Sequence, residues 1–169
     1  MNTEVLIAPL RQVALFEGLA PSQLAAIAKT AERIVFKPGD TLIRDGRDAG
    51  GALIVVSGDA ERLGLDGAGA RIEPGSMLAE MSMFVDTEAS ATVVARSPVR
   101  ALRLDRQAML EQLATDPSLA DYFVARISSR LKDVADELRR VDRTLGGEGA
   151  MEAEWSPVDG DAPERSVLH

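Results

Sequence analysis

The chain contains no cysteine, and its one histidine, His169, is the last of 169 residues. The lack of cysteine excludes disulfide bonds, zinc-thiolate sites and iron–sulfur clusters. Histidine-based acid–base catalysis and histidine ligation of a metal or haem are disfavoured, because only this one imidazole is present. No Ser-His-Asp, Cys-His or paired-carboxylate arrangement stands out in the sequence. We therefore expect that the protein is not an enzyme and holds no metal.

Long apolar runs and a targeting segment are absent as well. No stretch of 18 or more apolar residues occurs, and the first residues lack the basic lead-in and cleavage site of a signal peptide. We therefore expect a cytoplasmic protein that makes no membrane contact. The net charge is −8, and residues 146–169 alone hold six acidic residues and one basic residue. Because such an acidic surface repels nucleic acid, we expect no direct nucleic-acid binding.

The spacing of the apolar residues changes twice along the chain. Residues 3–33 carry apolar side chains three and four positions apart, which is typical of helices. Short strand-like segments follow at 34–36, 41–43, 52–57, 60–65, 70–72, 91–95 and 99–104, with glycine-containing turns between them. Helical spacing returns after Asp105, an expected N-cap, and a second helix begins at Pro117. This order predicts a mainly β protein, a small barrel or double-sheet roll with flanking helices.

The stretch EPGSMLAEMSMFVDTEASATVVA, residues 73–95, has the layout of a loop that cradles a phosphate, yet it contains no Lys or Arg. With LFEGLAPSQLAAIA and FKPGDTLIRDGRDAGGALIVVSGDAERL before it, it resembles the cyclic nucleotide-binding domain. That family serves catabolite-activator-type (CRP-FNR-like) regulators, protein-kinase regulatory subunits and gated ion channels. The likeness spans about residues 9–145 and implies a double-stranded β-helix (jelly roll) with N-terminal helices and two C-terminal helices. The tight turns of the family fall at Gly39, Asp40, Gly46 and Gly58.

In this family backbone N–H groups and an arginine hold the cyclic phosphate, and a glutamate accepts a ribose hydroxyl. By the resemblance, Glu80 matches the glutamate, while Ala79 replaces a glycine and Ala89 replaces the phosphate arginine. Losing a two-bond arginine contact costs about 3–6 kcal/mol. Cyclic AMP or cyclic GMP binding is therefore possible but disfavoured, and no cofactor is assigned; Glu80 alternatively caps backbone amides in a contracted pocket. The candidate ligand-binding residues are Met77, Leu78, Ala79, Glu80, Ala89, Ser90, Ala91 and Arg130.

The last helix, about residues 117–145, carries apolar residues at a 4-3-4-3-4 spacing with charges of both signs between them. This spacing is that of a coiled-coil seam, and it predicts a parallel homodimer. In the alternative, the stripe packs on the chain's own barrel, together with Leu119, Tyr122 and Phe123. The predicted interface residues are Ile127, Leu131, Val134, Leu138, Val141 and Leu145.

We expect residues 1–145 to form the cyclic nucleotide-binding-like domain and residues 146–169 to form an acidic, disordered tail. Catabolite-activator-type relatives continue into a helix-turn-helix, which this tail does not resemble, so we expect no DNA-binding module. Within the tail, Trp155 is either an anchor for a partner or simply an exposed residue.

The leading hypothesis is a dimeric regulatory or signalling module with a degenerate phosphate cassette, which acts through protein partners or an altered ligand. A first alternative is a genuine cyclic nucleotide sensor that uses a substitute cation. The residues considered for that role are Arg71, Arg96, Arg100 and Arg130. A second alternative is a CRP-FNR-like transcription regulator that lacks its own DNA-binding domain. The sequence does not identify the partner.

Overall fold

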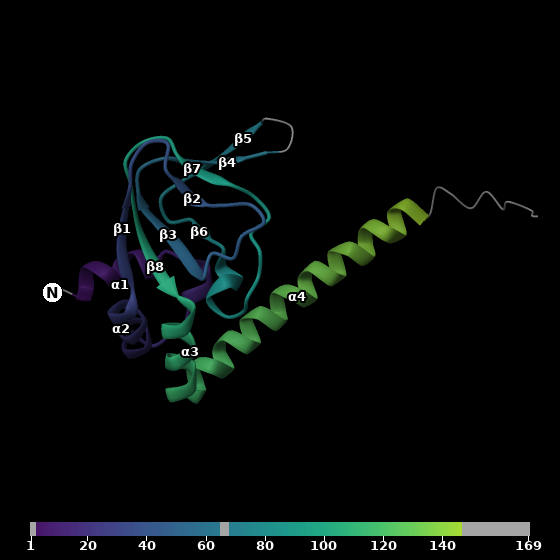
Figure 1. Ribbon diagram of the computed structural model, residues 1–169. Coiled ribbons are helices and arrows are strands. Elements are labelled where there is room, and N and C mark those ends of the chain that lie inside the picture. Colours follow the sequence, from purple (N-terminus) through teal and green to yellow (C-terminus); the bar gives the residue numbers. More distant parts are fainter. Residues whose placement is uncertain (1–2, 65–67, 147–169) are drawn as a thin grey trace, which may run out of the picture. The chain divides into compact units, whose positions relative to one another are not determined.

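The computed structural model describes residues 3–64 and 68–146, in two units that divide after Ser128. The N-terminal unit contains two four-stranded antiparallel sheets, one in the order β1-β8-β3-β6 and the other in the order β2-β7-β4-β5. Figure 1 shows α1, α2 and α3 gathered at one end of this roll and the β4–β5 hairpin at the other. The predicted jelly roll with flanking helices is confirmed.

The strands are β1 (Glu32–Phe36), β2 (Thr41–Ile43), β3 (Gly51–Ser57), β4 (Ala60–Leu63), β5 (Gly69–Ile72), β6 (Met77–Leu78), β7 (Val93–Ala95) and β8 (Val99–Asp105). The helices are α1 (Thr3–Arg11), η1 (Ala14–Phe16), α2 (Pro21–Thr30), η2 (Glu80–Met83), α3 (Arg106–Thr115) and α4 (Pro117–Gly146). Two local predictions were wrong. The N-terminal helical region ends at Thr30 and not at residue 33, because β1 begins at Glu32 to pair with β8. The short strand β6 was missed because its two residues offer no period to recognise.

The central strands β3 and β8 are covered on both faces, which explains the continuous apolar run in β3. Alternate residues of these strands pack into two different hydrophobic cores. Ala52 and Ile54 face the helices, in a core that includes Phe16, Ile27 and Phe123. The intervening Leu53 and Val55 face the second sheet, in a core that includes Ile43, Leu78, Val93 and Ala95.

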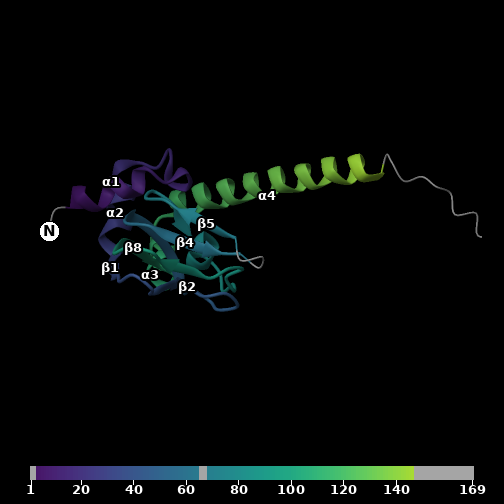
Figure 2. The same ribbon diagram turned by 90° about the horizontal axis from the view of Figure 1, so that it is seen from above.

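Capping residues set the helix boundaries of this unit. The Asp105 carboxylate accepts a hydrogen bond from the Ala108 N–H at 3.2 Å, as expected for an N-cap. Asp116 does the same for Leu119 at the start of α4, at 3.1 Å. Pro21 lies in the first turn of α2, where its missing N–H costs nothing. Figure 2 shows α1 and α2 side by side on the flank of the roll.

The first turns of α4 belong to the N-terminal unit. Leu119 and Phe123 are buried there, and the Tyr122 hydroxyl donates to the Leu15 carbonyl at 3.0 Å. The alternative, in which the helix packs on its own unit, therefore holds for this N-terminal part of α4. These three residues are distinct from the apolar stripe farther along the helix.

The C-terminal unit, from Ser129, is described only as the remainder of α4. Its apolar stripe is exposed: Leu131 is 66% exposed and Leu138 is 64% exposed, and Val134 and Val141 are exposed as well. Two ion pairs at i, i+3 spacing lie along the helix, between Asp136 and Arg139 and between Glu137 and Arg140. The Leu145 side chain and residues 147–169, with Trp155, lie outside the described part of the chain. Within the described residues, no helix has the length and apolarity needed to cross a membrane.

Candidate functional site

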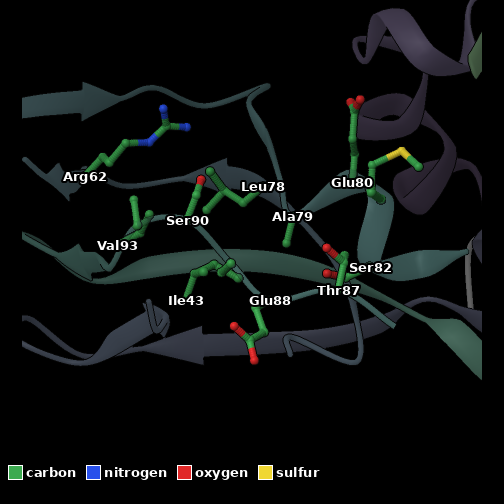
Figure 3. A pocket seen from close by; sticks show the side chains of 13 residues that line it. Ile43, Arg62, Leu78, Ala79, Glu80, Ser82, Thr87, Glu88, Ser90 and Val93 are labelled. Atoms are coloured by element: carbon green, nitrogen blue, oxygen red, sulfur yellow. The ribbon is translucent and has the colours of Figure 1, made fainter. Parts of the chain in front are cut away.

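The cassette region encloses one side of a cavity of about 210 Å³ in the N-terminal unit. Its walls come from β2, β4, the β6–η2 corner and the loop that leads into β7 (Figure 3). The lining is mostly apolar. The lining residues are Ile43, Arg62, Leu78, Ala79, Glu80, Met81, Ser82, Thr87, Glu88, Ala89, Ser90, Ala91 and Val93.

The structure brings six of the eight predicted ligand-binding residues to this one cavity: Leu78, Ala79, Glu80, Ala89, Ser90 and Ala91. Met77 does not line it. Because residues alternate along β6, Met77 packs against the core on the helix side while Leu78 faces the second sheet. Arg130 belongs to the C-terminal unit and is not assigned to the cavity.

Ala79 has a left-handed backbone, with φ 52° and ψ 42°. Among the described residues it is the only one other than glycine with a positive φ. A Cβ in this conformation costs about 1–2 kcal/mol, because it approaches the following carbonyl. The position thus keeps a backbone suited to glycine while carrying a methyl group, and this methyl group lies at the cavity wall. The η2 turn follows at once, closed by a hydrogen bond from the Ser82 N–H to the Ala79 carbonyl at 2.9 Å.

Ala89 is fixed by two backbone hydrogen bonds to the β2–β3 connection. Its N–H donates to the Arg47 carbonyl at 2.9 Å, and its carbonyl accepts from the Gly46 N–H at 2.9 Å. The neighbouring Glu88 forms an isolated antiparallel bridge with Asp48. The backbone route of the cassette is therefore held in place, while the side chain at this position is a methyl group without charge.

One arginine side chain reaches the cavity, and it comes from β4. Arg62 lines the cavity, on the same face of the strand as the buried Ala60 and opposite Val93 across the β4–β7 pair. Sequence reasoning missed Arg62. The alternation of side chains along 60–65 predicts that it faces inward with Ala60, but only the register with β7 shows that it reaches the cassette.

Three of the arginines considered as substitute cations, Arg71, Arg96 and Arg100, do not line the cavity. Arg71 pairs with Asp59 at 2.6 Å, and Arg96 pairs with Glu61. Arg100 lines a separate depression with Val35 and Val56. Strand alternation turns Arg71 and Arg100 away from the cassette, and Arg96 lies in the turn after β7.

A second arginine, Arg106, bonds the cassette from outside the cavity. Arg106, the first residue of α3, donates through Nε to the Ser82 carbonyl at 2.9 Å. Its guanidinium also bonds the Asp48 carboxylate and lies 3.9 Å from the Asp86 carboxylate. The Gly50 N–H bond is the main cause that holds the pKa of Asp48 below its usual value; burial raises this pKa, and the hydrogen bond and charge of Arg106 lower it further. Arg106 thus ties η2 and the β2–β3 connection to the start of the C-terminal helices.

The described residues, 3–64 and 68–146, contain no group of three or more His, Asp or Glu side chains placed to hold a metal ion. The chemistry available at the cavity is instead that of a small binding site. It offers one guanidinium, the hydroxyls of Ser82, Thr87 and Ser90, and two carboxylates from Glu80 and Glu88.

Comparison with known proteins identifies the family to which the chain belongs. The family model described as the cyclic nucleotide-binding domain matches residues 33–116. The chain is 25% identical over 134 residues to the CRP-like cAMP-activated global transcriptional regulator of Mycobacterium tuberculosis, which covers 76% of this chain and 60% of the regulator. The chain therefore spans less than two thirds of that protein's length.

Solved structures agree with this match. A cyclic nucleotide-binding-like protein from Brucella abortus is 32% identical with a TM-score of 0.58, covering 65% of this chain and 98% of that one. The N-terminal domain of a transcriptional regulator from Streptomyces coelicolor is 26% identical with a TM-score of 0.69, covering 77% and 94%. The matched segment contains both sheets and the whole cassette, and the chain belongs to the cyclic nucleotide-binding domain family.

Proposed function

We propose that this chain is a non-enzymatic regulatory module in which the phosphate-binding cassette is degenerate, so that it acts through a protein partner or an altered ligand. One observation carries the proposal: Ala89, at the position of the family's phosphate arginine, lines the cavity with a methyl group. A nominal micromolar site that loses about 3–6 kcal/mol falls to roughly 10⁻⁴–10⁻² M.

The size of the cavity supports the same proposal. Pockets that take drug-sized ligands usually enclose about 300–1,000 Å³, whereas this cavity measures about 210 Å³. The Ala79 methyl group takes up part of the wall at which a ligand would approach the backbone.

The charge balance near the cassette supports it further. Glu88 lines the cavity next to Ala89, and Asp86 lies in the same loop, so the cassette carries negative charge beside the position of the family's phosphate arginine. A carboxylate next to a phosphate disfavours binding of that phosphate. Asp86 is partly balanced by Arg106, but Arg106 is engaged with Ser82 and Asp48 outside the cavity.

Regulation through assembly is supported by the exposed stripe of α4. Leu131, Val134, Leu138 and Val141 expose apolar surface at coiled-coil spacing, and burying that surface against a second copy is favourable. We therefore propose a parallel homodimer through this helix. The M. tuberculosis relative is a transcriptional regulator by name, and a role in gene regulation through a partner protein is compatible with the module.

Calorimetric titration with cyclic AMP, cyclic GMP and cyclic dinucleotides tests the degenerate cassette. We expect millimolar binding or none for each of them. A low-micromolar dissociation constant for a cyclic mononucleotide would overturn the proposal and favour a genuine cyclic nucleotide sensor. Titration of the M. tuberculosis relative with cyclic AMP under the same conditions shows whether the assay detects binding.

A further inference from the structure

Arg62 presents its side chain to the cavity from the sheet opposite the cassette. It pairs across strands with Val93 on one side and with Ala70 on the other. Residues that pair across strands share one face of the sheet, and Val93 is buried between the sheets. The register of β4 therefore directs Arg62 inward, at the exposed mouth of the cavity.

The guanidinium of Arg62 has no acceptor among residues 3–64 and 68–146, although its neighbours are paired. Glu61, the adjacent residue, is bonded by Arg96, and Asp59 is bonded by Arg71 through two nitrogens at 3.2 and 2.6 Å. The nearby carboxylates on β4 and its turn are thus taken by other arginines. Arg62 keeps its five N–H donors for water or for a ligand.

The polar and apolar parts of the cavity are separated. In Figure 3 the Arg62 guanidinium and the Ser90 hydroxyl lie toward one side, and the Glu88 carboxylate points to the opposite side. Between them the wall is formed by aliphatic side chains, Ile43, Leu78 and Val93. Such a cavity suits a molecule with one anionic end and a short apolar body.

We propose that Arg62 is the anion-binding residue of this cavity and that the ligand class is a small monocarboxylate with an aliphatic body. This inference rests on the proposed function, in which the cavity no longer serves a cyclic phosphate. A carboxylate matches one guanidinium through two parallel hydrogen bonds, and Ser90 can donate a third. The aliphatic body lies against the walls and displaces water from them. A single negative charge at the Arg62 end also stays away from Glu88.

The test uses the whole chain and sodium hexanoate as the probe, followed by ¹H–¹⁵N NMR. Hexanoate is expected to shift the amide signals of Ala79, Ala89 and Ser90 in a saturable manner. Hexanamide, which has the same body without the charge, is expected to bind at least tenfold more weakly. Saturable shifts confined to other residues would overturn the proposal. Binding of hexanamide as tight as that of hexanoate would overturn it as well.

Variants at two arginines assign the charge. Arg62→Gln is expected to weaken hexanoate at least tenfold, and Arg62→Lys is expected to restore part of that loss because it keeps the charge. Arg96→Gln, which removes a paired arginine outside the cavity, is expected to leave hexanoate binding unchanged. Unaltered binding in Arg62→Gln would contradict the assignment. Because the Arg62 side chain is exposed, the variant is expected to keep the wild-type thermal midpoint, which excludes unfolding as the cause of weaker binding.

A cyclic AMP titration of the same samples separates this inference from the proposed function. Low-micromolar cyclic AMP binding would overturn the proposed function whatever hexanoate does. Absence of both cyclic AMP and hexanoate binding would leave the degenerate cassette intact and overturn the carboxylate site alone.

Discussion

At the scale of single residues, the informative positions are those where an ordinary side chain occupies an unusual place. Ala79 is held in a left-handed conformation that glycine adopts without penalty. The surrounding structure maintains this strain through the Ser82-to-Ala79 hydrogen bond and the packing of β6. A strained backbone at a cavity wall is a common sign of a functional site. Ala79 is therefore a position at which glycine would fit without strain.

Ala79→Gly is therefore expected to stabilise the fold by about 1 kcal/mol, because relief of the left-handed strain exceeds the entropy that glycine loses on folding. Urea denaturation measures the change. Ala91→Gly is the matched control, since Ala91 lines the same cavity without a positive φ. It is expected to lose about 0.5–1 kcal/mol. An equal loss of folding stability in the two variants would show that the Ala79 backbone is not strained.

At the scale of elements, Arg106 links α3 to the cassette. Its side chain is 19% exposed, and it bonds a backbone carbonyl of η2 and the Asp48 carboxylate. The sequence shows Arg106 only as the residue after an N-cap. Its partners lie 24 and 58 positions away, so no local pattern predicts them.

Arg106→Met is expected to destabilise the fold by about 2 kcal/mol, since it leaves two acceptors without a charged donor. Arg103→Gln is the control, because Arg103 makes only a 3.7 Å surface contact with Asp105. Its cost is expected to be below about 0.5 kcal/mol. Chemical denaturation of both variants provides the comparison. A cost for Arg106→Met no larger than that of Arg103→Gln would show that the link does not hold the cassette.

The start of α4 carries a pH dependence. Hydrogen bonds from Ser118 first, then from Gln23 and the Leu119 N–H, hold the pKa of Asp116 below its usual value. A carboxyl with a lowered folded-state pKa stabilises the fold above its unfolded-state pKa, and this contribution is lost as the pH falls through the folded-state value.

Stability is therefore expected to decline below about pH 4, and Asp116→Asn is expected to make that decline shallower. Asparagine still caps a helix but does not titrate in this range. Thermal unfolding followed from pH 6 to pH 2.5 measures the slope. An identical acid slope in Asp116→Asn and the wild type would refute the role of this carboxyl.

At the scale of the whole molecule, we propose that the exposed stripe on α4 mediates dimerisation. Leu131→Glu with Leu138→Glu places charge in the proposed seam and is expected to yield a monomer by light scattering. Val85→Glu with Leu110→Glu changes two exposed apolar residues elsewhere and is expected to leave the mass unchanged. A wild-type monomer, or a seam variant that stays dimeric, would contradict the proposed dimer.

Much of the fold is predictable because glycine turns and apolar periods are local signals. The segments 34–36, 41–43 and 99–104 all fall within strands of the structure, and Asp105 caps a helix as expected. The cassette is also predictable, through its resemblance to a family. Arg62 was missed because its place depends on the register between β4 and β7, which single-strand patterns do not specify.

We propose that the absence of a cation at position 89 prevents cyclic phosphate binding, because Ala89 offers only a methyl group to the cavity. Calorimetry of the wild type and of Ala89→Arg with cyclic AMP tests this proposal. We predict millimolar or weaker binding for the wild type and at least tenfold tighter binding for Ala89→Arg, because the restored guanidinium bonds the phosphate. Low-micromolar binding by the wild type, with no gain in Ala89→Arg, would contradict the account.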